Sequence, residues 1–368
     1  MPERYFDHHS TTPLSAAARR VMDQARESVG DPLRLHERGR AAQRLLAEAR
    51  ESVADAVGAQ PDEIVFSSGG TESVTLALDG APAGRIVLGA VEHPAVAGAA
   101  ADREVVTAPV DEYGRVDVDR FAAEVRAPGT AVASVQHANH EVGTIQPVAE
   151  AADFAHARNV LFHTDACQTA GRLPIDAAGL GADLLSISGH KFGGPAGTGA
   201  LYVRRGVRLV PMLAGDDRER RRRAGLQNLP GIVGMAAALR ECVDAMKDRA
   251  ATQWSLTTEL RRGIEDRAPG ARAHGHPTQR APHLVCFSVD GVDEEALLMA
   301  LDHRGFRLDG GSVSTGSATA TSPVLEAMGV PGTIGIRASV GPETTEDDVD
   351  ALVGTLDELI GSLRRAAG

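Results

Sequence analysis

Short apolar runs alternate with amphipathic stretches along the first half of the chain. Mostly apolar runs bounded by glycine or polar residues predict six buried strands. These strands are Glu63–Ser67, Arg85–Gly89, Ala131–Gln136, Val160–Asp165, Leu184–Ser188 and Gly199–Arg204. Apolar residues at helical spacing predict helices over Arg40–Val57, Thr71–Leu78, Val118–Val125 and Val148–Arg158. The alternation favours an α/β fold with a mostly parallel sheet that helices cover on both faces.

The pattern changes after a long helical stretch over Ile232–Arg267. Two further strands are predicted there, His283–Val289 and Ile334–Val340, and the predicted helix Glu294–His303 lies between them. Because the regular alternation of strand and helix ends in this region, we expect a second, smaller α+β domain.

Composition and charge fit a folded protein with two domains. We place the large domain at residues 12–245 and build the small domain from residues 1–11 and 246–368. The chain has 368 residues, 43% of them hydrophobic, which is enough for more than one core. It has no apolar run long enough for a membrane span or a signal peptide, so we expect a cytoplasmic protein. The formal net charge of −12 argues against a nucleic-acid partner.

Cysteine and lysine usage narrows the possible chemistry. Cys167, Cys242 and Cys286 are far apart and form no CxxC pair, so we expect neither a disulfide framework nor a metal site. Of the 38 basic residues only Lys191 and Lys247 are lysines. Arginine cannot replace a lysine whose neutral amine reacts. Lys247 lies in a charged helical stretch and is expected to be solvated, which leaves Lys191 as the candidate for chemistry.

The surroundings of Lys191 in the sequence favour Schiff-base chemistry. Lys191 follows an apolar strand and precedes a glycine turn, with Ser188 and His190 beside it. Partial burial at such a place lowers the pKa of the amine toward the neutral form that attacks a carbonyl. Asp165 ends another predicted strand, and Gln168 follows it. A buried carboxylate there can hold the protonated pyridine nitrogen of pyridoxal phosphate (PLP).

A phosphate turn and a histidine complete the set. Ser67–Glu72 runs from a strand into a helix, and the free N–H groups around Gly70 and Thr71 can hold a phosphate. His93 can stack on an aromatic ring. Each feature alone is common in structural roles, since strand-end aspartates cap helices and single histidines form hydrogen bonds in protein cores. Their order along the chain is what indicates a PLP site.

Seven segments also resemble a known family across nearly the whole chain. They are Tyr5–Pro13, His36–Arg40, Ser67–Glu72, His137–Gly143, His163–Gln168, Ser188–Lys191 and Arg337–Gly341. In them the chain resembles the class V, fold-type I PLP enzymes, and among these the cysteine desulfurases of the NifS and IscS type. The resemblance implies the PLP-dependent transferase fold and a homodimer with the active site at its interface.

The resemblance also implies roles for single residues. Lys191 would hold PLP as a Schiff base, and Arg337 would clamp the substrate carboxylate as a two-point fork. The other expected cofactor contacts are Asp165 with the ring nitrogen, Gln168 with the ring hydroxyl, His93 with the ring face, and Gly70, Thr71, Ser188 and His190 with the phosphate.

The departures from the family motifs change the expected reaction. Desulfurases carry their persulfide-forming cysteine in a loop that reads like SSGSACTS, and Ser314–Thr321 places Thr319 at that position. A threonine hydroxyl cannot carry a persulfide. The loop that follows Thr319 is also shortened. The family's persulfide route is therefore disfavoured, and Thr319 becomes a candidate substrate contact.

Two more motifs differ near the expected cofactor. In the family's HVNNE motif the second Asn contacts the ring and the substrate, and here Asn139 is followed by His140. A titratable imidazole can donate to the ring oxygen or move a proton, so His140 joins Lys191 and His93 as a candidate catalytic residue, with Asn139 beside the substrate. The family's RSGT motif ends in Leu226, which removes a hydroxyl that reaches the partner's phosphate. Two interpretations of the basic run of Arg218 and Arg220–Arg223 stay open: an arginine supplies the missing phosphate contact or recognises a larger substrate, or the run is a solvated loop.

We hypothesise a PLP enzyme that cleaves the carbon–sulfur bond of an S-substituted L-cysteine by β-elimination. Lys191 would take the Cα proton, and the products would be a thiol, pyruvate and ammonia. Desulfurase-like enzymes without the cysteine are known in antibiotic pathways such as lincosamide biosynthesis. Three alternatives stay open: decarboxylation-coupled oxidative deamination to an aldehyde, cysteine desulfuration itself, and a non-catalytic desulfurase-like partner protein.

Overall fold

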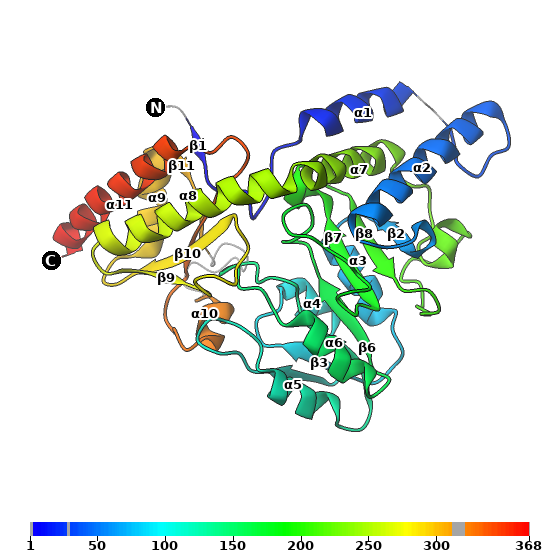
Figure 1. Cartoon of the computed structure of the whole chain (residues 1–368), viewed down its shortest axis with the longest axis horizontal. Helices are drawn as coiled ribbons and strands as arrows, with labels where there is room; N and C mark the ends of the chain where they lie inside the picture. Colours follow the sequence, from blue (N-terminus) through cyan, green and yellow to red (C-terminus); the bar gives the residue numbers. More distant parts are fainter. Residues whose placement is uncertain (1–2, 28–29, 311–320, 368) are drawn as a thin grey trace.

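A seven-stranded sheet forms the centre of the larger part of the protein (Figure 1). The computed structural model describes residues 3–27, 30–310 and 321–367. The sheet order is β2-β8-β7-β6-β5-β3-β4. The strands are β2 (Ile64–Ser67), β3 (Arg85–Gly89), β4 (Val105–Ala108), β5 (Thr130–Ser134), β6 (Leu161–Asp165), β7 (Leu184–Ser188) and β8 (Gly199–Val203). Strands β3 to β7 pair in parallel, and β8 runs antiparallel to both of its neighbours.

Helices cover both faces of this sheet. They are α1 (Ala16–Glu27), α2 (Glu37–Ala56), α3 (Gly70–Asp79), α4 (Pro94–Ala99), α5 (Val118–Val125), α6 (Val148–His156) and α7 (Leu229–Asp244). Helices α2 and α7 share one core with the sheet, and α5 and α6 extend that layer over the central parallel strands. Helices α3 and α4 bury their apolar sides on the opposite face. Short 3₁₀ turns lie at Pro61–Glu63, Gly189–Phe192 and Arg218–Arg221.

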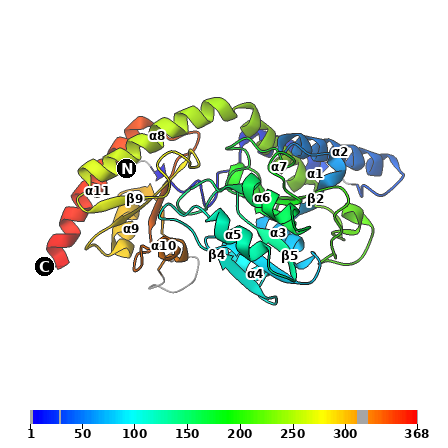
Figure 2. The same ribbon diagram turned by 60° about the horizontal axis from the view of Figure 1, so that its bottom comes forward.

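A smaller antiparallel sheet of order β12-β13-β10-β9 lies beside the large one. Its strands are β9 (Ala271–His274), β10 (Leu284–Val289), β12 (Asp309–Gly310) and β13 (Ile336–Ser339), and β1 (Arg4–Tyr5) pairs in parallel with β11 (Phe306–Arg307). The remaining helices are α8 (Met246–Arg267), α9 (Glu294–His303), α10 (Pro323–Ala327) and α11 (Glu346–Ala367). Helices α8, α9 and α11 bury their apolar sides in a second core against this sheet. Helices α7 and α8 follow one another across the molecule and connect its two parts (Figures 1 and 2).

The predicted α/β fold with a mostly parallel sheet is confirmed. All six strands predicted in the first half are present within a residue or two of their expected bounds. The predicted helical stretch over 232–267 is two helices that meet at Ala245, which ends α7 and begins α8. Strand β4 was not predicted because it lies at the sheet edge, where two of its residues are exposed and its apolar signal is short. Within the described ranges, no helix is both long and apolar enough to cross a bilayer.

A buried ion pair fixes a strained turn at the edge of the large sheet. Arg50 on α2 reaches Glu219 with both terminal nitrogens, at 2.7 and 2.8 Å. The main-chain N–H of Phe66 donates to the same carboxylate. Glu219, Arg220 and Arg221 have φ of 46°, 55° and 64°, in the left-handed region that side chains disfavour. The two-point pair offsets the strain of this turn.

We predict that Arg50→Met lowers the free energy of unfolding by about 3–5 kcal/mol, because it leaves the carboxylate of Glu219 buried without its cation. Urea unfolding of the parent and the variant measures this difference. The control is Arg205→Met, since Arg205 pairs with Asp62 at the exposed surface and its loss should matter far less. Equal losses in the two variants would contradict this view of the turn.

Candidate active site

A cavity of about 440 Å³ lies at the carboxyl ends of the parallel strands β6 and β7. Ligands bind at this end in open parallel sheets, because the loops there diverge and leave a crevice. Its lining includes all nine residues that the sequence assigned to a cofactor. These are Gly70, Thr71, His93, His140, Asp165, Gln168, Ser188, His190 and Lys191.

Lys191 is held in a buried position at the end of β7. Its Nζ donates to the main-chain carbonyl of His9 at 2.8 Å. Arg172 and Thr12 donate to the carbonyl oxygen of Lys191 itself, at 2.6 and 2.8 Å. Burial lowers the pKa of the Lys191 amine to about 8. A substantial neutral fraction near physiological pH suits an amine that forms a Schiff base.

Asp165 presents a fixed carboxylate at the end of β6. Its Oδ1 accepts from the main-chain N–H of Cys167 at 2.9 Å and from the hydroxyl of Ser186 at 3.1 Å. Among the described residues both hydrogen bonds go to Oδ1, which leaves Oδ2 for a ligand. This carboxylate fits the partner that a protonated pyridine nitrogen needs.

Helix α3 begins at the wall of the cavity. Its first residue, Gly70, has no room for a side chain, because a Cβ atom there would lie 2.6 Å from Sγ of Cys167. The same Cβ would lie 3.3 Å from Cβ of Ser188. The glycine therefore lets the free N–H groups of the helix start approach the cavity, beside Ser188 and His190. Such a helix start with hydroxyl and imidazole neighbours suits a phosphate.

Two histidines that line this cavity contact each other. The rings of His93 and His140 lie edge to face, with centroids 4.9 Å apart. Nδ1 of His93 accepts from the N–H of Ala95, which places the ring proton on Nε2 when the ring is neutral. Nδ1 of His140 is buried and has no partner among the described residues, and its Nε2 lies 3.6 Å from Glu141. Burial lowers the pKa of both rings, so both are neutral near pH 7 and able to accept a proton.

The three predicted substrate contacts have different positions. Asn139 does not line the cavity, and its side chain bonds the carbonyl of Val91 and the N–H groups of Glu141 and Val142. Asn139 therefore shapes the turn that carries His140. Thr319 lies outside the described residues. Arg337 lies on β13, where its Nη2 pairs with Oδ2 of Asp309 at 2.6 Å.

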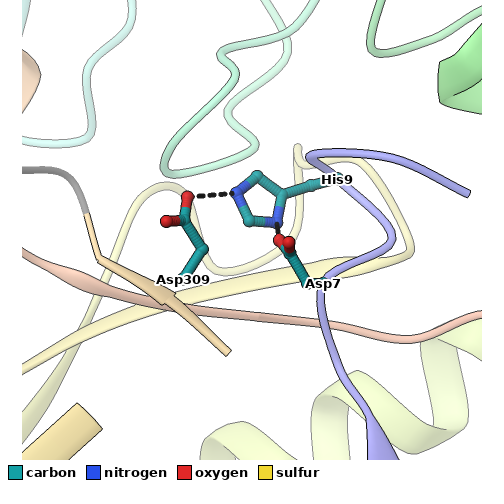
Figure 3. A group of neighbouring side chains, drawn as sticks. All are labelled: Asp7, His9 and Asp309. Atoms are coloured by element: carbon teal, nitrogen blue, oxygen red, sulfur yellow. Dashed lines mark ion pairs between the residues drawn. The ribbon is translucent and has the colours of Figure 1, made fainter. Parts of the chain in front are cut away.

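Sequence reasoning missed a group of side chains next to Arg337. Figure 3 shows His9 between two carboxylates, with Nδ1 3.3 Å from Asp7 and Nε2 3.3 Å from Asp309. Their donor atoms lie within 4.8 Å of one another, a spacing that can hold a metal ion. Asp7 contacts Nδ1 of His9 and Asp309 contacts Nε2, on the other side of the ring, so the three side chains do not converge on one point. Asp309 also has the guanidinium of Arg337 as its positively charged partner. We therefore describe the group as a histidine held between two carboxylates, one of which forms an ion pair with Arg337.

The basic run is mostly paired with acids. Arg218 lies 2.7 Å from Asp31, and Arg221 lies 2.8 Å from Asp217. Arg223 differs because its Nε lies 3.0 Å from Glu72, which lines the cavity next to Thr71. Arg220 and Arg221 are exposed, as the solvated interpretation expects, whereas Arg218, Arg222 and Arg223 are partly buried. Arg223 is the arginine that pairs next to the phosphate turn.

Comparison with known proteins agrees with this geometry. The aminotransferase class-V family matches residues 4–352. A cysteine desulfurase IscS of Methanosarcina thermophila is 38% identical over 375 residues, which cover 98% of this chain and 92% of the relative. A cysteine desulfurase of Cereibacter sphaeroides is 38% identical over 381 residues, which cover 99% of this chain and 97% of the relative. A solved NifS-like protein superposes with a TM-score of 0.90 at 31% identity and covers 98% of this chain and 100% of its own. The chain therefore belongs to the aminotransferase class-V family, in its cysteine desulfurase (IscS/NifS-like) group.

Proposed function

We propose that this chain is a PLP-dependent carbon–sulfur lyase that acts on an S-substituted L-cysteine. One observation carries the proposal: a Schiff-base lysine stands in a chain whose three thiols are all held protonated. Burial raises the pKa of Cys167 well above its usual value, and it also raises the pKa of Cys242 and Cys286. A thiolate is needed to accept sulfur as a persulfide, and Thr319 takes the family position for one.

The family uses PLP, and the cavity fits this cofactor. Lys191 would bind its aldehyde carbon, Asp165 its ring nitrogen, and the start of α3 with Ser188 and His190 its phosphate. His93 would lie against the ring. When bound, PLP supplies an electron sink that stabilises negative charge at the substrate Cα.

The residues of the chain then account for the proton movements. The neutral amine of Lys191 takes the proton from Cα, and the electron pair left at Cα forms a double bond to Cβ. The Cβ–S bond breaks at the same time, and the sulfur leaves with its organic group as a thiolate. The neutral ring of His140, in the same cavity, accepts at one nitrogen the proton that Lys191 has taken and passes the proton of its other nitrogen to that sulfur, which returns Lys191 to its neutral form. Water then converts the remaining three-carbon fragment to pyruvate and ammonia.

The exposed apolar side chains support a homodimer. Six of them lie on three loops: Leu33, Leu35, Val210, Met212, Leu213 and Leu226. Arg223, three residues before Leu226, pairs with Glu72 in the cavity lining. The ion pair of Arg218 with Asp31 and the main-chain bond between Ala224 and Leu213 hold these loops together. Apolar side chains as exposed as Leu35, at 89%, are typical of a surface that a second subunit covers. Such a dimer would place the cavity beside its interface, and a lyase of this kind would serve a pathway that processes cysteine conjugates, such as antibiotic biosynthesis.

The first prediction concerns the products. The parent protein should release methanethiol and pyruvate from S-methyl-L-cysteine, and Lys191→Ala should lose the absorbance of bound PLP and at least about 10²-fold in rate. Absorbance spectra and product assays measure both effects. Alanine and sulfide from L-cysteine would instead establish a desulfurase, and an aldehyde would establish the decarboxylating alternative. Unchanged biological activity of Lys191→Ala without bound PLP would favour the non-catalytic partner.

The second prediction follows from the pKa of Lys191, which burial lowers to about 8. Only the neutral amine attacks the aldehyde, so cofactor-free protein should capture PLP about tenfold faster per pH unit as pH rises toward 8. Above that pH the rate should level off. Stopped-flow absorbance follows the capture. A rate that keeps rising to pH 10, as for an ordinary lysine, would contradict the desolvation of this amine.

The third prediction tests proton transfer by His140. His140→Asn keeps a hydrogen-bonding side chain and removes the titratable ring, so kcat for S-methyl-L-cysteine should fall about 10²-fold while KM changes little. The matched control is His303→Asn, an exposed histidine at the end of α9, which should keep the parent rate. Full kcat in His140→Asn would limit His140 to a contact with the ring.

A further inference from the structure

Asp309 faces Arg337 because of the way two strands pair. The two residues are direct partners in the antiparallel register of β12 and β13. Cross-strand partners place their side chains close together on one face of a sheet. Here this brings Oδ2 of Asp309 to 2.6 Å from Nη2 of Arg337. The strand register therefore fixes a carboxylate against the guanidinium that would receive the substrate.

Asp309 is also connected to Lys191, through His9. His9 lies against Asp309 through Nε2 at 3.3 Å (Figure 3). The main-chain carbonyl of the same His9 accepts from Nζ of Lys191 at 2.8 Å and from Gln168 at 3.0 Å. Asp309 is thus connected to the reactive amine through one residue, His9, although neither Asp309 nor Arg337 is among the residues that line the cavity.

The charges in this group leave Arg337 compensated. Burial acts to raise the pKa of Asp309, but the neighbouring imidazole of His9 and the charge of Arg337 bring it below its usual value, so the carboxylate is ionised. Burial lowers the pKa of His9 to about 4, and burial with the charge of Asp309 raises that of Asp7 to about 6. His9 is therefore neutral and does not cancel the charge of Asp309. A substrate carboxylate would meet a neutral ion pair in place of a free cation.

Arg337 still has room for a second acceptor. Its side chain is only 8% exposed, and its Nε is buried with no partner among the described residues. A guanidinium presents five N–H donors and binds carboxylates through neighbouring pairs of them. The contact with Asp309 is made at Nη2. A further carboxylate oxygen at Nε would satisfy a donor that is otherwise costly to bury.

We infer that Asp309 is a specificity-determining residue, which shares the guanidinium of Arg337 with the α-carboxylate of the substrate and weakens its binding. The inference rests on the proposed function, in which Arg337 receives that carboxylate. Two like charges on one guanidinium oppose each other, so the carboxylate alone anchors a substrate poorly. A small amino acid such as free L-cysteine is then held weakly. A conjugate gains affinity from the group on its sulfur, which favours conjugates over free cysteine.

The test uses PLP-loaded protein and two ligands that cannot undergo elimination. L-norvaline has the shape of S-methyl-L-cysteine without its sulfur, and butylamine is the same molecule without the carboxylate. Titration of the cofactor absorbance gives Kd for each. In Asp309→Asn the Kd of L-norvaline should fall about tenfold or more, because the competing charge is gone, while the Kd of butylamine should change less than about twofold.

Two variants serve as controls. Asp302→Asn removes one charge from an exposed aspartate that pairs with Arg307, and it should leave both Kd values unchanged. Asp309→Glu keeps the charge and should keep the Kd of L-norvaline within about threefold of the parent. If Asp309→Asn does not fold, Asp309→Ser supplies the neutral side chain in the same titration.

Three results would overturn the inference. If Asp309→Asn binds L-norvaline as the parent does, Asp309 does not compete with the substrate carboxylate. If it binds L-norvaline more weakly, Asp309 instead positions Arg337. Equal tightening of L-norvaline and butylamine would show that the carboxylate is not the group affected. A parent protein that responds to neither ligand would contradict the proposed function itself, which separates the two failures.

Discussion

The hydrogen bond from Lys191 to the carbonyl oxygen of His9 joins the two sheets of this protein. Lys191 belongs to the end of β7 in the large sheet. His9 follows the N-terminal strand β1, and its main-chain N–H donates to Ser339 at the end of β13 in the small sheet. The amine is buried because both structures close around it, and its lowered pKa depends on that closure. A shift of one sheet against the other would expose the amine and restore an ordinary lysine.

Burial away from water, more than the charge of neighbouring groups, sets the protonation states of the side chains in this site. Burial leaves the imidazoles of His93 and His140 neutral, and it raises the pKa of Glu92 well above its usual value. Arg337 and Asp309 stay charged and are held as a pair. A cavity with few free charges keeps protons on the residues that move them, and it makes each added charge on a ligand costly unless a partner is present.

Sequence patterns selected nine candidate cofactor residues that the fold brings into one cavity, for reasons visible in single residues. Lys191 is conspicuous because almost every other basic residue of the chain is an arginine. Asp165 and Ser188 are candidates because they end neighbouring parallel strands, whose carboxyl ends lie at the same edge of the sheet. Asp309 gave no such signal. Its strand has two residues, too short for periodicity, and its partner Arg337 is brought opposite by the fold alone. Asn139 matched a motif position, yet its side chain is used by the backbone of its own turn, which only three-dimensional hydrogen bonds reveal.

The contact between Gly70 and Cys167 has a consequence for how such chains diverge. Sγ of Cys167 fills the space where a side chain at position 70 would lie, so the helix start and the strand-end loop share one small volume. A larger residue at either position moves the turn away from the cavity, and a smaller one at 167 opens a void beneath it. We therefore expect a change of size at one of the two positions to need a matching change at the other. The thiol of Cys167 has a packing role here that requires no sulfur chemistry.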